Sequence, residues 1–89
     1  MSEFYRFPAM AELSEWDNAQ QIEQIDEEVE EARRAYYESD NEIPYGVELM
    51  DVIHAAETAL RMTFNDSEVS HLHDLVIEKN RKRGYYDER

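Results

Sequence analysis

Apolar residues recur at every third or fourth position through most of this chain, which is the period of an α-helix rather than of a β-strand. Placing successive residues about 100° apart around a helix axis gathers them into stripes. The first two stripes are Ile22, Ile25, Val29, Ala32 and Tyr36, and then Leu49, Val52, Ile53, Ala56 and Leu60. A third stripe contains Val69, Leu72, His73 and Val76. The pattern predicts an all-α protein, a small helical bundle of three to four helices per chain.

Capping residues and helix breakers predict where the helices begin and end. The first long helix is expected near residues 18–38, with Asp17 or Asn18 as its N-cap. The next is expected to start at Tyr45 or Gly46, just after Pro44, and to run to about Met62. The last is expected at about 67–83, with Asp66 or Ser67 as its N-cap and Gly84 just after its end.

The first 17 residues are expected to form an arm and one short helix. Residues 1–8 contain Phe4, Tyr5 and Phe7 and are expected to be irregular, with the aromatic side chains packed on a neighbouring element. A short helix is expected over roughly 9–16. The whole chain, 1–89, is interpreted as one domain, with residues 18–86 forming the longer helices.

Length and charge restrict the function. A chain of 89 residues buries a limited core, and helical chains of this size often complete it by oligomerising. The net charge of −13 argues against binding a nucleic-acid polymer or an anionic membrane surface. Cysteine is absent, which excludes thiolate chemistry and disulfides. With no apolar run of membrane-spanning length and no signal-peptide pattern, the expected location is the cytoplasm.

Two carboxylate pairs flank the apolar stripes. Glu28 with Glu31, and Glu48 with Asp51, are each spaced i,i+3, so the members of a pair project from one face of a helix. If the two helices pack side by side, four carboxylates converge, and they repel one another unless a cation lies among them. Such oxygen ligands suit Mg²⁺, with Mn²⁺ as the alternative. A chain with 22 acidic residues also produces these spacings by chance, on a solvated face.

Polar residues near the end of the last helix form a second candidate group. Asn80 falls on the inward stripe of that helix, and Lys79 and Arg83 flank it. One interpretation is that these residues meet an anionic substrate beside the metal. The other is that cations gather at the negative end of the helix dipole.

The histidines and the tryptophan are assigned more ordinary roles. His54, His71 and His73 are interpreted as non-ligands, with His54 on the exposed side of its helix. Trp16 is interpreted as core packing, with stacking on a nucleobase as the alternative.

The acidic motifs resemble a known family. Glu27-Glu28-Val29-Glu30-Glu31 followed by Glu48-Leu49-Met50-Asp51 is similar to the EExxE and ExxD motifs of the MazG-like all-α nucleoside triphosphate pyrophosphohydrolases. The ending Glu78-Lys79-Asn80-Arg81-Lys82-Arg83-Gly84-Tyr85-Tyr86 is similar to the last helix of small, often phage-type members. The resemblance covers roughly residues 18–86.

This resemblance implies an activity and a set of residues. The expected reaction is metal-dependent hydrolysis of an NTP or dNTP between the α and β phosphates, giving a monophosphate and pyrophosphate. The implied assembly is a homodimer or homotetramer with active sites near or across a subunit interface. The implied metal ligands are Glu28, Glu31, Glu48 and Asp51, and Glu28 or Glu31 is also the candidate base that takes a proton from water. The implied substrate-binding residues are Lys79, Asn80, Arg83, Gln21, Gln24 and Trp16.

A non-catalytic protein is the competing hypothesis. An acidic helical chain can mimic the phosphate charge of DNA and occupy a basic site on a partner, or it can be a degenerate family member with an incomplete pocket. A mimic spreads its carboxylates over its surface, whereas a metal enzyme concentrates them in one pocket. The inward phase of the two carboxylate pairs favours the enzyme.

Overall fold

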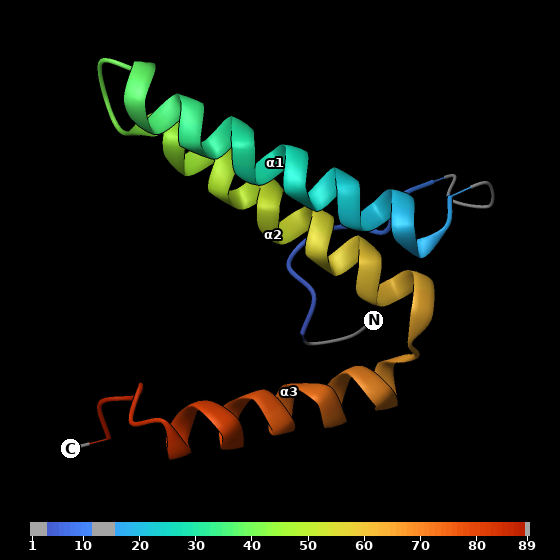
Figure 1. Ribbon diagram of the computed structural model, residues 1–89. Helices are drawn as coiled ribbons and strands as arrows, with labels where there is room; N and C mark the ends of the chain where they lie inside the picture. Colours follow the sequence, from blue (N-terminus) through green and yellow to red (C-terminus); the bar gives the residue numbers. More distant parts are fainter. Residues whose placement is uncertain (1–3, 12–15, 89) are drawn as a thin grey trace.

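Three helices make up the regular structure of the part of the chain that is described. The computed structural model describes residues 4–11 and 16–88. Helix α1 spans Asn18–Glu38, α2 spans Ile43–Thr63 and α3 spans Asp66–Lys82 (Figure 1). These residues contain no strand, so the predicted all-α class is confirmed for them. None of their helices is both long enough and apolar enough to cross a membrane.

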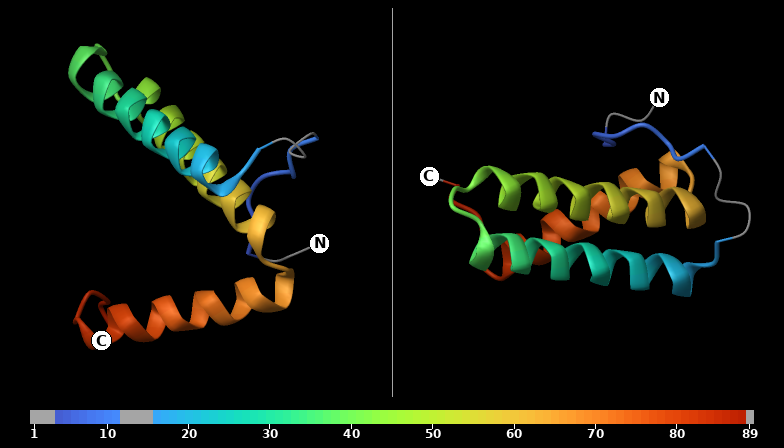
Figure 2. Two further views of the ribbon diagram at one scale, coloured as in Figure 1. Left: turned by 45° about the vertical axis from the view of Figure 1, so that its right-hand side comes forward. Right: turned by 90° about the horizontal axis from the view of Figure 1, so that it is seen from above.

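Helices α1 and α2 form an antiparallel hairpin that is the packed unit of the chain. They run side by side over their whole length and are joined by residues 39–42 (Figures 1 and 2). Ala32 on α1 and Ala55 on α2 are 5% and 7% exposed, and their small side chains let the two backbones approach closely. Gln21 reinforces the seam, because its Nε2 donates a hydrogen bond to the backbone oxygen of Ala55 at 2.9 Å.

Capping interactions explain where the helices start. Asp17 caps α1 in a reciprocal box with Gln20, so the helix predicted near 18–38 and the first of its two candidate caps are confirmed. Helix α3 has the same kind of box, formed by Asn65 and Glu68. The predicted caps Asp66 and Ser67 are therefore wrong by one and two positions.

Helix α2 begins earlier than expected. It starts at Ile43, before Pro44, because a proline fits in the first turn of a helix, where its missing N–H leaves no bond unmade. The side chain of Asn41 accepts a hydrogen bond from the Ile43 N–H at 2.9 Å. Gly84 follows the end of α3 and adopts φ 75°, the left-handed conformation that glycine readily takes just after a helix. Its predicted place at the end of the last helix is therefore confirmed.

The N-terminal arm is irregular where it is described. Residues 4–11 are non-helical, as predicted for residues 1–8. The short helix expected over 9–16 is not present at residues 9–11 or at Trp16, and residues 12–15 lie outside the described part of the chain. The aromatic side chains of the arm do pack on helices: the Phe4 ring lies 4.9 Å from the His73 ring and the Phe7 ring 4.9 Å from the His54 ring.

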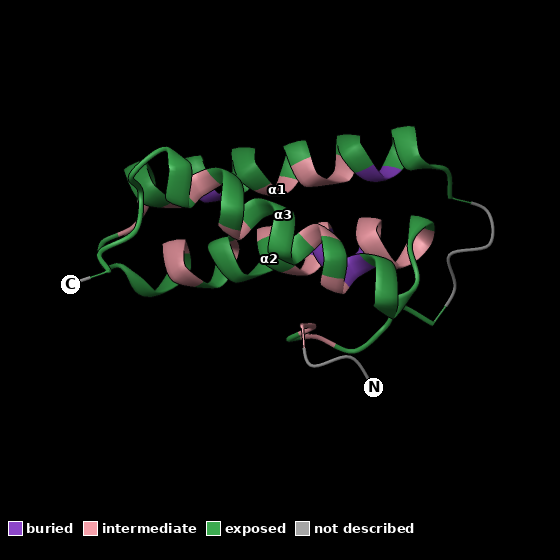
Figure 3. Ribbon diagram, turned by 90° about the horizontal axis from the view of Figure 1, so that it is seen from below, coloured by how far each residue is buried: buried purple, intermediate pink, exposed green. Residues whose placement is uncertain are grey.

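Helix α3 diverges from the hairpin instead of packing along it. It leaves the end of α2 and runs beneath the hairpin, with a gap that widens toward its C-terminal end (Figures 1 and 2). Its buried anchor is Val69, which is 4% exposed. The apolar stripes are consequently only partly covered. Buried residues lie mainly where α1 and α2 face each other, whereas Ile22 is 62% exposed and Leu49, Ile53 and Val76 are also exposed (Figure 3).

Enlarging the small residue in the hairpin seam should destabilise the fold. Replacing Ala32 by Leu inserts atoms where the two backbones are close, and we expect the free energy of unfolding to fall by about 1–3 kcal/mol. Urea denaturation followed by circular dichroism measures the change. Ala19→Leu is the matched control, because Ala19 lies on the same helix and is exposed. Equal stability of the two variants would contradict the close packing described here.

Candidate metal centre

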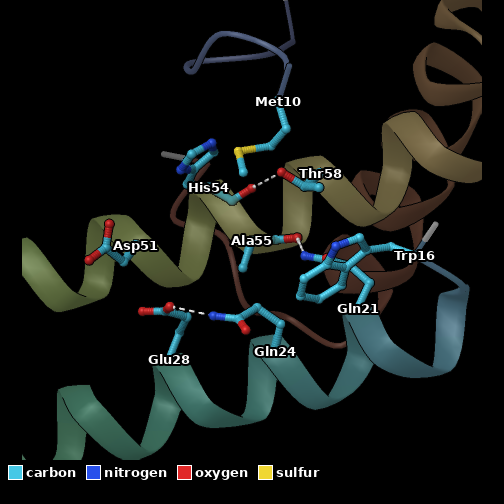
Figure 4. A pocket seen from close by; sticks show the side chains of 9 residues that line it. All are labelled: Met10, Trp16, Gln21, Gln24, Glu28, Asp51, His54, Ala55 and Thr58. Atoms are coloured by element: carbon cyan, nitrogen blue, oxygen red, sulfur yellow. Dashed lines mark hydrogen bonds between the residues drawn. The ribbon is translucent and has the colours of Figure 1, made fainter. Parts of the chain in front are cut away.

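Carboxylates from both acidic motifs meet at the middle of the hairpin. Glu28 on α1 and Glu48 and Asp51 on α2 each offer an oxygen, and these oxygens all lie within 4.8 Å of one another. Figure 4 shows the Glu28 and Asp51 side chains facing each other across the gap between the helices. The convergence predicted from the i,i+3 spacing is therefore present in the structure for these three residues, which we call the carboxylate cluster.

The local fold explains this convergence. Because the connection between α1 and α2 is short, residues that precede it on α1 pair with residues that follow it on α2 at similar depth. Glu48 and Asp51 are one helical turn apart and therefore reach toward α1 from the same face. The alanines of the seam bring the two helix axes close enough for these short and medium-length side chains to meet.

Glu31 lies beside the carboxylate cluster. Its charge acts on both Glu28 and Glu48, and it lines a surface hollow together with Glu48 and Arg34. Glu31 is exposed, whereas Glu28 and Glu48 are half-buried. Glu31, the fourth acid of the predicted set, thus lies at the outer edge of the cluster and is not one of its three converging members.

Burial and mutual repulsion make this cluster electrostatically unfavourable in the absence of a cation. Partial burial raises the pKa of Glu28, the charges of Glu31 and Asp51 raise it further, and the hydrogen bond from Gln24 opposes them. The pKa of Glu48 is raised by burial and then by the charges of Glu31, Asp51 and Glu28. These carboxylates repel one another more strongly in the fold than in the unfolded chain.

Two oxygens of the cluster have no hydrogen-bond partner among the described residues. Glu28 Oε2 and Glu48 Oε2 are buried and accept no hydrogen bond from the described residues. The other Glu28 oxygen, Oε1, accepts a hydrogen bond from Gln24 Nε2 at 2.8 Å, which fixes the carboxylate's orientation. Buried, unpaired carboxylate oxygens in a group of acids are the donor set that Mg²⁺ or Mn²⁺ prefers, so the residues present fit such an ion.

A cavity of about 320 Å³ extends from the carboxylate cluster along the hairpin seam (Figure 4). Glu28 and Asp51 form its acidic end. The three residues predicted to recognise the substrate by position, Trp16, Gln21 and Gln24, all line it. Gln21 is 3% exposed, and its hydrogen bond to Ala55 holds its side chain in place in the cavity wall.

Sequence reasoning missed other residues of the cavity wall, His54 among them. Met10, His54 and Thr58 also line the cavity. The expectation that His54 lies on the exposed side of its helix is wrong: it is half-buried, its Nε2 is buried and it stacks on Phe7. The arm covers this side of α2, which helix phase alone does not reveal. Residue spacing could have placed His54 in the cavity wall, because His54 follows Asp51 by three positions and therefore projects from the same side of the helix.

The polar group of α3 lies apart from this cavity. Lys79, Asn80 and Arg83 are at the end of α3, where the gap to the hairpin is widest (Figure 1). None of them lines the cavity, and the described residues that do line it include no Lys or Arg. Asn80 is half-buried and its backbone oxygen accepts a hydrogen bond from Tyr85 N, whereas Arg83 lies 5.9 Å from the Tyr85 ring.

Neutralising one acid of the cluster should stabilise the metal-free protein. With EDTA present at pH 7, Glu48→Gln removes a repelled charge and should raise the melting temperature above that of wild type. The pKa of Glu48 is raised in the fold, so wild-type Glu48 takes up a proton as the pH falls through that pKa. The difference in melting temperature between Glu48→Gln and wild type should then shrink. Melting curves at pH 7 and pH 4.5 measure it.

The control for this comparison is Glu27→Gln. Glu27 is exposed and is not one of the clustered acids. If Glu27→Gln raised the melting temperature as much as Glu48→Gln does, the stabilisation would come from the change in net charge, which would contradict a local repulsion.

Comparisons of the chain with protein-family models, with curated proteins and with solved structures gave no match. The likeness of the two acidic motifs to the MazG-like family therefore stays a prediction from the residues themselves.

Proposed function

We propose that this protein is a metal-dependent nucleoside triphosphate pyrophosphohydrolase of the MazG-like kind, which hydrolyses NTPs or dNTPs between the α and β phosphates. The observation that carries the proposal is the meeting of Glu28, Glu48 and Asp51 at the end of a cavity, where two buried carboxylate oxygens accept no hydrogen bond from any residue that the structure describes. Acids that served only to solvate a helix face would point into water and would not face one another across a helix seam.

The carboxylate cluster is the proposed site for Mg²⁺ or Mn²⁺. Glu28, Glu48 and Asp51 hold the ion, and Gln24 keeps the Glu28 carboxylate turned toward the cluster. When bound, the ion supplies positive charge that attracts the phosphate oxygens and stabilises the charge that develops on them during hydrolysis.

The chain's own carboxylates also supply a base. Water adds its oxygen to a phosphorus of the α–β anhydride, the bond from that phosphorus to the bridging oxygen breaks, and pyrophosphate and a monophosphate result. The proton lost by the water goes to a carboxylate, and Glu31 and Glu28 are the candidates. Glu31 suits this role because it lies beside the cluster without being one of its three converging members.

The cavity is proposed to take the nucleoside end of the substrate. Its volume of about 320 Å³ lies within the usual range of small-molecule pockets. Trp16 offers an aromatic face, and the Gln21 and Gln24 amides offer hydrogen-bonding groups beside it.

A second copy of the chain is proposed to complete the site. Besides the proposed ion, cationic side chains are the usual partners of a triphosphate, and the described lining of the cavity has no Lys or Arg. Lys79, Asn80 and Arg83 lie at the C-terminal end of α3. Apolar residues such as Ile22 and Ile53 remain exposed on the hairpin. A homodimer or homotetramer that covers these residues would also bring α3 of one chain to the cavity of another.

The reaction is tested by pyrophosphate release from a panel of NTPs and dNTPs. We expect release with Mg²⁺ or Mn²⁺ and none with EDTA. Glu48→Gln and Asp51→Asn should each lower the rate about a hundredfold or more, because each removes a charge from the proposed ion site. Glu27→Gln should retain the wild-type rate, and circular dichroism should show all of these variants folded.

Near-normal rates of pyrophosphate release in Glu48→Gln and Asp51→Asn would contradict the assignment of the site. No release from any nucleotide by the folded wild type, with both metals tried, would favour the competing acidic interaction protein. Metal titration then separates the two classes, since saturable Mg²⁺ or Mn²⁺ binding that raises the melting temperature requires a concentrated site.

Mixing two inactive variants tests whether the site is shared between chains. Glu48→Gln damages the carboxylate cluster, and Lys79→Ala removes a proposed phosphate contact. If Lys79 acts on the partner's site, co-refolding equal amounts gives mixed dimers with one intact site each. We expect about a quarter of the wild-type rate for a dimer, because half of the dimers are mixed. Recovery of no activity in the mixture would place both residues in the site of a single chain.

A further inference from the structure

Glu57 is a buried acid that lies outside the carboxylate cluster. It lies on α2 and is only 7% exposed. Its two oxygens accept hydrogen bonds from backbone N–H groups of the N-terminal arm: Arg6 N is 3.1 Å from Oε1 and 2.9 Å from Oε2, and Phe7 N is 3.0 Å from Oε1. A carboxylate is costly to bury without such partners, and charge-assisted bonds are the strong ones. Glu57 therefore holds the arm on α2.

Side-chain contacts on both sides of this attachment reinforce it. The Arg61 guanidinium lies 3.9 Å from the centre of the Tyr5 ring. The Phe7 ring stacks on His54 at 4.9 Å with an interplanar angle of 26°. Tyr5, Phe7 and the Glu57 bonds thus follow one side of α2 and fix the course of the arm.

The same arm contributes to the wall of the cavity. Three residues beyond Phe7, Met10 lines the cavity beside His54 and Thr58 (Figure 4). His54 is the link between the two features, because one face of its ring carries Phe7 and the residue also lines the cavity. The attachment of the arm at Glu57 and the shape of this cavity wall are therefore coupled.

We propose that Glu57 is a positioning residue for substrate binding: it seats the N-terminal arm so that Met10 forms part of the wall around the nucleoside. The inference rests on the proposed function and adds to it a group remote from the metal. Met10 offers a flexible apolar thioether, which suits contact with the flat face of a nucleobase. The phosphates stay at the acidic end, which the arm does not form.

Two changes detach the arm without touching the carboxylate cluster. Arg6→Pro deletes the N–H that bonds both Glu57 oxygens, whereas Arg6→Ala keeps that N–H and is the matched control. Glu57→Gln keeps the shape of the side chain but removes its charge and turns an amide N–H₂ toward the arm's own donors. Because Arg6 lies outside the hairpin, the proline variant remains informative if Glu57→Gln is poorly folded.

Hydrogen exchange of the Phe7 amide, followed by NMR, reports the attachment directly and needs no activity. We expect protection in wild type and Arg6→Ala, and loss of protection in Arg6→Pro and Glu57→Gln. The KM of the best substrate, and the Kd of α,β-imido-dATP, -dCTP, -dGTP or -dTTP with Mg²⁺, should rise about tenfold in the two detached variants, as for one lost apolar contact in a pocket. The kcat and the Mg²⁺ midpoint should stay at the wild-type values.

Any of three results would overturn the inference. One is a Phe7 amide that exchanges equally in all the variants. The second is loss of Phe7 protection with unchanged KM and Kd. The third is loss of Phe7 protection with kcat and Mg²⁺ affinity falling together, as expected of an arm that only stabilises the fold. Failure of the proposed function appears differently, as a wild-type protein that neither binds nor hydrolyses any nucleotide while Phe7 is protected, and the substrate role of Glu57 then falls with it.

Discussion

Close packing of α1 against α2 is the constraint on which the described structure depends. Alanines at the seam and the Gln21 bond to Ala55 bring the helix axes together, and this approach forces Glu28 toward Glu48 and Asp51. The same contact therefore stabilises the hairpin and concentrates negative charge inside it. A surface hairpin would relieve that repulsion by turning its acids outward, as Glu23, Glu27 and Glu30 do here. The cation proposed for this site would offset the charge of the three acids that stay at the seam.

The rest of the chain is attached to this hairpin more loosely, and through polar contacts as much as apolar ones. The arm is held by backbone bonds to Glu57, and α3 by Val69 together with the ring contact of Phe4 and His73. In the described part of the chain, Ile22, Leu49 and Ile53 of the hairpin stay exposed beside these two elements. The association of copies proposed above would bury these exposed apolar residues.

Local features were predictable from the sequence, whereas contacts between distant segments were not. Capping residues predicted where α1 begins, and residue spacing predicted that Glu28, Glu48 and Asp51 meet. Both predictions depend on residues within a few helical turns of one another. Helix phase placed His54 in water, because the arm that covers it lies far away in sequence. Helix phase also puts Glu57 among the outward acids, and this is wrong for the same reason, because Glu57 is 7% exposed and its partners are backbone N–H groups of the arm, which leave no trace in residue identity. The outward course of α3 likewise depends on tertiary contacts that propensity does not contain.

The order of the chain also bears on how the acidic site comes into being. All of the clustered acids belong to one helical hairpin, and the loop that joins its helices is residues 39–42. Closing so short a loop costs little chain entropy, and proteins dominated by such local contacts fold quickly. During synthesis, the hairpin leaves the ribosome before α3 does, so the acids can meet before the last helix has been made. The ion proposed for this site would then stabilise the hairpin while the chain is still being made, and metal supply would affect folding as well as activity.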